Sequence, residues 1–221
     1  MDLQLDGKRA VVTGSSAGIG EAIARRLAAE GAAVTVHGRR ANTVGAVVEA
    51  IRSLGGRASG VVADLADPQD CARFISGALT DGGVDILVNN AGAFANRGWD
   101  DVTPQDWLDL YAINVAAAVR CIQGFLPRMR SAGWGRIVQI GTGEAINPFP
   151  TMPDYAATKA AVLNLTVSLA KHLDRLVDED PLHHGALSSQ WSCQELATVL
   201  ARQTGVQVSR ESVREVLKKK T

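Results

Sequence analysis

The 221-residue sequence has little of what holds small secreted proteins or metal proteins together. It contains only three cysteines, Cys71, Cys121 and Cys193, which are far apart and form no CxxC pair. This usage is typical of reduced thiols in a cytosolic protein. None of the four histidines stands at zinc-motif spacing from a cysteine, so we predict no metal site.

The sequence also lacks net charge, a leader and a long apolar run. Its 23 basic residues balance 23 acidic ones, which argues against binding of nucleic acid by bulk electrostatics. The first residues show no basic and apolar pattern of a signal peptide, and no apolar run approaches the ~20 residues of a membrane span. We therefore predict a cytoplasmic protein with no membrane partner, built as one domain or one domain plus a small appendage.

Short apolar runs alternate with longer segments of helical periodicity. Strands are expected at 10–12, 33–36, 59–63, 86–88 and 137–140, and helices at about 18–30, 43–54, 68–79, 104–131 (as one element or two) and 154–172. Strands that alternate with helices of this length indicate βαβ units. The predicted fold class is α/β, a doubly wound parallel sheet with helices on both faces.

A glycine-rich loop, Thr13–Gly20, follows the first predicted strand and opens the first helix. Gly14 allows a tight turn, Gly18 lets the backbone approach a pyrophosphate, and Gly20 lets the helix pack close to the strand. The helix N-terminus offers free N–H groups and a positive dipole end to phosphates. The loop predicts a nucleotide site; an ordinary glycine-rich turn is the alternative.

A second motif pairs Tyr155 with Lys159. Residues four apart lie on one face of a helix, so the ammonium group favours the phenolate and lowers the tyrosine pKa. Such a tyrosine is a usable general acid or base. Taken alone, a Tyr/Lys pair is more often surface packing.

Together these motifs give residues 1–173 a strong resemblance to the short-chain dehydrogenase/reductase family. The family's motifs occur in order as the loop Thr13, Gly14, Gly18, Gly20; the run Asn89, Asn90, Ala91, Gly92; the helical Asn114; and the pair Tyr155, Lys159. The resemblance implies a Rossmann-type sheet and hydride transfer between a nicotinamide and a small alcohol or carbonyl. It also implies a homo-oligomer through the helices that carry Asn114 and Tyr155.

The resemblance assigns roles to four catalytic residues. Tyr155 would exchange the proton of the substrate oxygen, and Lys159 would lower the tyrosine pKa and hold the nicotinamide ribose. Asn114 would position a water in the proton relay. Thr142 stands where the family usually has a serine that steadies the substrate oxygen; a turn residue at a strand end is the alternative. The implied cofactor contacts are Gly14, Ser15, Ser16, Gly18, Ile19, Gly20, Asp64, Leu65, Asn90, Ala91, Gly92, Tyr155 and Lys159.

Cofactor choice depends on the end of the second strand. An acid there binds the ribose 2′-hydroxyl of NAD, whereas an arginine accommodates the 2′-phosphate of NADP. This chain has Arg39 and Arg40 and no acid. We predict a preference for NADP(H), with Arg39 the better candidate and NAD(H) the second choice. A solvated pair of loop arginines is the alternative.

The pattern changes near residue 173. The family's later strands and substrate-covering segment are not recognisable, which predicts a C-terminally incomplete sheet. Residues 174–189 are acidic and then turn-rich, and are predicted as a linker. Residues 190–221 predict two short helices joined at Gly205, the first opened by a capping box at Ser192–Glu195.

This small helical tail resembles the helix-turn-helix region of insertion-sequence transposases. Arg210, Arg214 and Lys218 share one side of its second helix, and residues 181–221 carry six basic and three acidic residues, a net +3. The resemblance implies weak, salt-sensitive DNA binding. A helical hairpin with a solvated basic face is the alternative. A transposase-derived segment joined to a dehydrogenase would explain both resemblances.

Three functions therefore compete. The first is an NADP(H)-dependent oxidoreductase. The second is a catalytically impaired cofactor-binding remnant, and the third is a DNA-binding protein in which the tail acts. We rank them in this order because all four catalytic positions hold chemically suitable residues.

Overall fold

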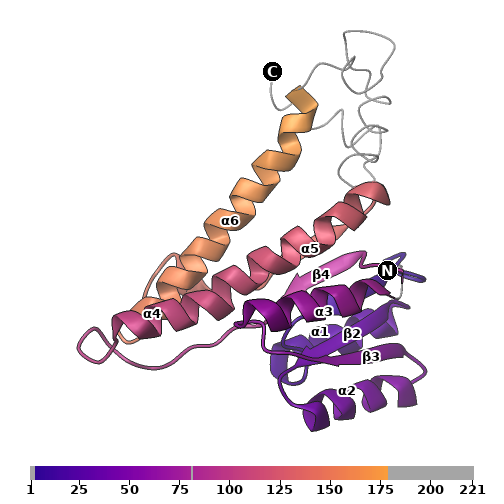
Figure 1. The fold of residues 1–221 in the computed structure, drawn as a ribbon, viewed down its shortest axis with the longest axis horizontal. Helices are drawn as coiled ribbons and strands as arrows, with labels where there is room; N and C mark the ends of the chain where they lie inside the picture. The colour runs from indigo at the N-terminus through magenta and orange to yellow at the C-terminus, as the bar shows by residue number, and fades with distance from the viewer. Residues whose placement is uncertain (1–2, 81, 179–221) are drawn as a thin grey trace. The chain divides into compact units, whose positions relative to one another are not determined.

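The structure, a computed structural model, describes residues 3–80 and 82–178. The predicted helix-turn-helix at 190–221 lies outside this range. The strands are β1 (Arg9–Val12), β2 (Ala33–Gly38), β3 (Arg57–Val62), β4 (Ile86–Asn89) and β5 (Arg136–Gln139). The helices are α1 (Gly18–Ala29), α2 (Ala41–Ser53), α3 (Pro68–Thr80), α4 (Pro104–Tyr111), α5 (Ala117–Ser131) and α6 (Pro153–Asp178), with short turns η1 (Ala112–Ala116) and η2 (Gly143–Ala145) (Figure 1).

The five strands form one sheet in the order β3-β2-β1-β4-β5. Strand β1 pairs in parallel with β2, where Ala10 lies opposite Val34, and with β4, where Ala10 lies opposite Ile86. The chain therefore winds outward in one direction from β1 to β3 and then in the other from β4 to β5. At such a reversal the chain leaves β1 and β4 toward opposite faces of the sheet, and ligands bind at the carboxyl ends of these strands. The predicted α/β fold is confirmed.

Apolar side chains on both faces of the sheet form the core. On one side Val44 and Val48 of α2 lie against Gly60 of β3, where a side chain in place of glycine would collide with them. On the other side Phe74 of α3 packs edge-on against Phe125 of α5, with ring centroids 6.3 Å apart. Right-handed crossovers in opposite directions place α2 and α3 on opposite faces.

Helices α4 and α5 join through a π-helical turn to form a nearly continuous element. Its start is well specified, because Thr103 and Asp106 form a capping box and Pro104 occupies the first turn. The π turn at η1 carries Asn114, and such single turns are frequent at functional sites. Residues 104–131 are long and apolar enough to meet a length-and-hydropathy test for a membrane span. Buried Val115, Cys121 and Phe125 belong to the protein core, so this helix indicates no membrane.

Helix α6 is longer than its sequence pattern predicts. It extends to Asp178 instead of ending near His172, and so includes the first residues of the predicted linker 174–189. The acidic composition of this stretch suggested a break, but it contains no proline or glycine before Pro181. Charged residues are compatible with helix, which explains the error.

The chain divides into two compact units. The first comprises residues 1–125 and 137–166 and contains the sheet, and the second comprises residues 126–136 and 167–221. In the described part of the second, Arg130 Nη2 lies 2.8 Å from His172 Nε2, and the Arg136 guanidinium stacks 4.8 Å above the Trp134 ring. The predicted three-part division at 1–173, 174–189 and 190–221 stays a prediction.

Candidate active site

The glycine-rich loop passes between β1 and α1 with two glycines in the left-handed region. Gly14 has φ +65° and Gly18 has φ +60°. A Cβ atom on Gly14 would lie 2.9 Å from the Cα atom of Ala91, so only glycine lets the loops after β1 and β4 approach this closely. Ala17, the N-cap of α1, supplies no side-chain cap, and the first-turn N–H groups are left for an anion.

Hydrogen bonds tie the loops after β1 and β4 together. The Thr13 hydroxyl accepts the N–H groups of Asn90, at 3.0 Å, and Ala91, at 2.9 Å. In return the Asn90 amide donates to the carbonyls of Thr13 and Gly14. The predicted contact residue Ser15 is turned inward: its buried hydroxyl donates to Val12 O at 2.6 Å and accepts from His37 N. Its side chain thus supports the loop from inside.

His37, for which the sequence predicted no role, is hydrogen-bonded to the same loop. Its Nδ1 accepts the Gly14 N–H at 2.9 Å, which requires the tautomer that carries its proton on Nε2. That Nε2 group donates to the Ala63 carbonyl at 3.1 Å. Burial lowers the His37 pKa, against smaller opposing effects of the Ala63 carbonyl and the Asp64 and Asp70 carboxylates. The neutral ring therefore links the glycine loop to the end of β3.

This linkage predicts acid sensitivity. The folded-state pKa of His37 lies below its unfolded value of ~6.5, so the unfolded chain takes up the proton first as pH falls. The free energy of unfolding is expected to fall below pH ~6.5 with a contribution approaching ~1.4 kcal/mol per pH unit. Urea unfolding between pH 5 and 8 should show a flatter profile for His37→Gln, which keeps a donor and an acceptor without titrating. Equal slopes in both proteins would contradict this.

A cavity of about 280 Å³ lies beside the glycine loop. Its lining residues are Gly14, Ser16, His37, Gly38, Arg39, Asp64, Leu65, Ala66, Ala91, Gly92, Ala93 and Ile113. Seven of the fifteen predicted cofactor contacts therefore meet at one cavity. The other predicted contacts are not among its lining residues: Ser15, Gly18, Ile19, Gly20, Arg40, Asn90, Tyr155 and Lys159. Of the two arginines only Arg39 lines the cavity, while Arg40 is the N-cap of α2.

Three predicted catalytic residues lie together at the start of α6 and the end of β5. Thr142, just after β5, lies close enough to Tyr155 for its hydroxyl to lower the tyrosine pKa by hydrogen bonding. Lys159 is 7% exposed, donates from Nζ to the Ile140 carbonyl at 2.9 Å and lies 5.8 Å from the centre of the Tyr155 ring. The Phe94 ring packs against the Tyr155 ring, with the two ring centroids 5.7 Å apart. This arrangement groups two side-chain hydroxyls and one ammonium group around the start of α6.

The proton affinity of Tyr155 differs from the sequence prediction. Burial and, to a smaller extent, the Glu144 carboxylate raise its pKa above the ordinary value, and the Thr142 hydrogen bond opposes them. Burial also lowers the pKa of Lys159. The prediction that Lys159 lowers the Tyr155 pKa is therefore wrong for this structure, in which the Tyr155 pKa is raised. At neutral pH Tyr155 is a protonated phenol.

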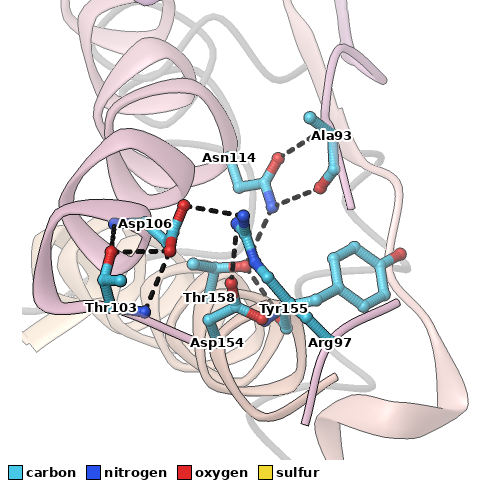
Figure 2. Close-up of polar contacts among 8 residues, drawn as sticks. All are labelled: Ala93, Arg97, Thr103, Asp106, Asn114, Asp154, Tyr155 and Thr158. Carbon is cyan, nitrogen blue, oxygen red and sulfur yellow. Dashed lines mark hydrogen bonds and ion pairs between the residues drawn. The ribbon is translucent and has the colours of Figure 1, made fainter. Parts of the chain in front are cut away.

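Asn114 links three elements around this cluster. Its Oδ1 accepts the Ala93 N–H at 2.8 Å, and its Nδ2 donates to the Ala93 carbonyl and to the Thr158 hydroxyl, each at 2.9 Å. Thr158 in turn donates to the Tyr155 carbonyl at 2.7 Å. The amide joins the loop after β4, the π turn and α6 (Figure 2). Its predicted role in holding a water stays a prediction.

An ion-pair cluster that the sequence did not signal lies beside Tyr155. Arg97 donates to Asp106 at 2.6 Å and to Asp154 at 3.2 Å, and Asp154 is completely buried. The carboxylates are separated by 48 residues in sequence, which is why no local pattern indicates the cluster. Among the residues that the structure describes, no group of three or more His, Cys, Asp or Glu side chains could hold a metal.

The sequence profile of the short chain dehydrogenase family matches residues 8–177. That range contains the sheet, the glycine loop and the Tyr155 cluster. The chain belongs to the short chain dehydrogenase family. It is 40% identical over 171 residues to the uncharacterized oxidoreductase YvrD of Bacillus subtilis. This alignment covers 77% of this chain and 65% of that protein. The chain spans 65%, 64% and 61% of the length of three curated relatives.

Solved structures of other short chain dehydrogenases share the fold. The L-sorbose reductase of Gluconobacter frateurii, complexed with NADPH and L-sorbose, aligns with a TM-score of 0.76 at 34% identity, over 79% of this chain and 67% of that one. The 3-oxoacyl (acyl-carrier-protein) reductase of Agrobacterium tumefaciens C58, with NADP bound, aligns with a TM-score of 0.73 at 31% identity, over 91% and 89%. No finding supports the predicted transposase-like segment.

Proposed function

We propose that this short chain dehydrogenase is an NADP(H)-dependent oxidoreductase that interconverts an alcohol and a carbonyl, with Tyr155 as general acid/base. The observation that carries the proposal is that the side chains of Thr142 and Lys159 are neighbours of the Tyr155 side chain. The names of the relatives, which include NADP-bound and NADPH-bound reductases, support the same reaction class.

The residues present fit a dinucleotide. The positive end of α1, with no side-chain cap, would hold the diphosphate, and the lack of a side chain on Gly14 lets the glycine loop lie close to Ala91. Asp64 and Leu65 would contact the adenine side, and Arg39 would contact the 2′-phosphate. When bound, the cofactor supplies the hydride.

The protein's own contribution is proton transfer and orientation. Tyr155 donates its phenolic proton to the carbonyl oxygen as charge develops there. The Thr142 hydroxyl binds the same oxygen and the tyrosine, and the buried Lys159 ammonium stabilises the phenolate that remains. At neutral pH the protonated Tyr155 phenol is in the state that can donate a proton during carbonyl reduction.

Arg39 provides the test of cofactor choice. Arg39→Ala is expected to raise the NADPH dissociation constant roughly 10- to 100-fold, because a charge-assisted hydrogen bond of about 1.5–3 kcal/mol is lost. NADH affinity should stay the same, since that cofactor has no 2′-phosphate. Fluorescence titration of each nucleotide measures both values. Arg40→Ala is the matched control. If it loses as much NADPH affinity as Arg39→Ala, the assignment of the 2′-phosphate to Arg39 is wrong.

A second candidate is a protein that binds NADP(H) without turnover. The chain spans 65%, 64% and 61% of the length of three curated relatives, so turnover of a substrate by this chain is itself a proposal. The two functions separate on one measurement, since both predict NADPH binding but only the first predicts NADPH consumption with a carbonyl.

The homo-oligomer also stays a proposal. Leu108 of α4 is 64% exposed and Leu163 of α6 is 47% exposed. Both belong to the helical segments from which the sequence predicts association, and exposed apolar side chains of this size favour burial against a partner.

A further inference from the structure

We propose that Arg97 is a positioning residue that holds Tyr155 in place through Asp154. The inference rests on the proposed function, because it assigns a task to a residue outside the reacting groups. Arg97 lies in the loop after β4, whereas Tyr155 lies in the first turn of α6. Figure 2 shows Arg97 between the two carboxylates, with the tyrosine ring pointing away from them.

The first support is the way α6 begins. Asp154 is the residue immediately before Tyr155, and its carboxylate accepts the Tyr155 N–H at 2.8 Å. The other carboxylate oxygen accepts Arg97 Nη2 at 3.2 Å. The carboxylate is completely buried, so Arg97 is the positive charge that neutralises it. The first turn of α6 is therefore attached to the loop.

The second support is the fixed position of Arg97 itself. Its other terminal nitrogen donates to Asp106 at 2.6 Å, and Asp106 also accepts the N–H and hydroxyl of Thr103. The hydrogen bond from the Thr103 hydroxyl is the largest cause of the lowered Asp106 pKa, which keeps the carboxylate charged. The planar guanidinium thus spans two anchored carboxylates, a geometry that lysine cannot reproduce.

The third support is that the same loop is fastened a second time. Ala93, four residues before Arg97, exchanges two hydrogen bonds with Asn114, and Phe94 packs on the Tyr155 ring. The loop between Ala93 and Arg97 therefore contacts the tyrosine ring while both of its ends are bonded to helices. Loss of the Arg97 end would free the ring and the helix turn together.

The consequence for the reaction is loss of alignment. A displacement of about 1 Å from a remote substitution can lower a rate roughly 100-fold. Arg97→Met should therefore lower kcat roughly 10- to 100-fold. NADPH affinity should change less than about twofold, since Arg97 does not line the cofactor cavity.

A double substitution separates positioning from simple destabilisation. Arg97→Met leaves Asp154 buried without its neutralising partner, which lowers the thermal midpoint. Adding Asp154→Asn removes that charge, keeps an acceptor for Tyr155 N and does not restore the attachment. We expect the double variant to recover the thermal midpoint but not kcat, and Arg97→Lys to recover kcat only in part. Arg57→Met is the matched control, because Arg57 also binds two acceptors, Asp6 and Gly31, far from the site.

The measurements are kcat on the best carbonyl of a panel, NADPH affinity, thermal midpoint and amide hydrogen exchange of residues 153–160. The proposal is overturned if the double variant recovers kcat together with the thermal midpoint, or if Arg97→Met behaves like Arg57→Met. If the wild-type protein turns over no carbonyl, the proposed function fails, and hydrogen exchange decides the positioning alone. Faster exchange in both Arg97→Met variants than in the control supports it; equal exchange overturns it.

Discussion

Gly20→Ala is expected to raise the NADPH dissociation constant roughly 100-fold and to lower the free energy of unfolding by about 1–3 kcal/mol. A Cβ atom at this position would lie 2.5 Å from the Gly14 carbonyl oxygen and 2.9 Å from Ser15 Cα, and still closer to the Asn90 amide. Two of these neighbours are backbone of the phosphate loop, so they cannot move aside without changing the loop. The collision therefore distorts the glycine loop and its hydrogen bonds with the Asn90 amide.

Gly45→Ala is the matched control for this substitution. Gly45 lies in α2 with an ordinary helical backbone, and among the described residues a Cβ placed there meets no atom within 4 Å other than its chain neighbours and the backbone of its own helix. Alanine should stabilise the fold by about 0.4–1 kcal/mol and leave NADPH affinity unchanged. Calorimetric titration and urea unfolding measure both effects. Wild-type NADPH affinity in Gly20→Ala would contradict the assignment of the loop as the phosphate site.

Tyr155→Phe is expected to lower the rate of carbonyl reduction by roughly 10²- to 10⁴-fold. The substitution removes the proton donor and its hydrogen bond with Thr142, while the ring and its contact with Phe94 remain. NADPH affinity should be nearly unchanged, and the loss of one hydrogen bond should cost only about 1 kcal/mol of stability. A large fall in kcat without loss of binding is the signature of a group that acts in the reaction.

Tyr111→Phe is the control for this prediction, since Tyr111 is the only other tyrosine and lies exposed at the end of α4. Its reduction rate should equal that of the wild type. The pH profile gives a second check: because the raised pKa keeps Tyr155 protonated, the reduction rate should stay level from neutral pH to beyond ~10, the ordinary tyrosine value, before it falls. A reduction rate in Tyr155→Phe equal to that of the wild type would exclude Tyr155 as the donor.

Local patterns in the sequence were enough to predict the sheet and to name several residues that line the cavity beside the glycine loop. Strands such as Ala10–Val12 and Ile86–Val88 stand out because their apolar runs are short and bounded by turns. The positions of Gly14, Leu65 and Gly92 at one cavity follow from the parallel sheet, which brings the carboxyl ends of its strands together. These are properties that a local pattern and a topology rule determine.

The parts that the sequence did not predict depend on contacts between distant residues. His37 and Gly14 are 23 residues apart, and Arg97 and Asp154 are 57 apart. Neither pair has a fixed spacing or a periodic pattern, because side-chain hydrogen bonds between a loop and a distant strand or helix are set by packing. The inward turn of the Ser15 hydroxyl and the raised pKa of Tyr155 have the same origin, since burial decides both.

Sequence pattern also misplaced the end of α6. The acidic stretch after His172 suggested a linker, yet the helix continues to Asp178 because charged residues do not break a helix. The predicted helix-turn-helix and its DNA binding lie beyond the described residues and stay predictions. The family assignment is independent of them, since the matched range ends at residue 177.

Consumption of NADPH by the wild-type protein, measured over a broad panel of aldehydes and ketones beside Tyr155→Phe, tests the central claim most directly. The proposed function predicts that at least one carbonyl is reduced and that Tyr155→Phe lowers this rate roughly 10²-fold or more while still binding NADPH. NADPH binding without consumption above the Tyr155→Phe level for any carbonyl would contradict the claim and leave a cofactor-binding protein without turnover.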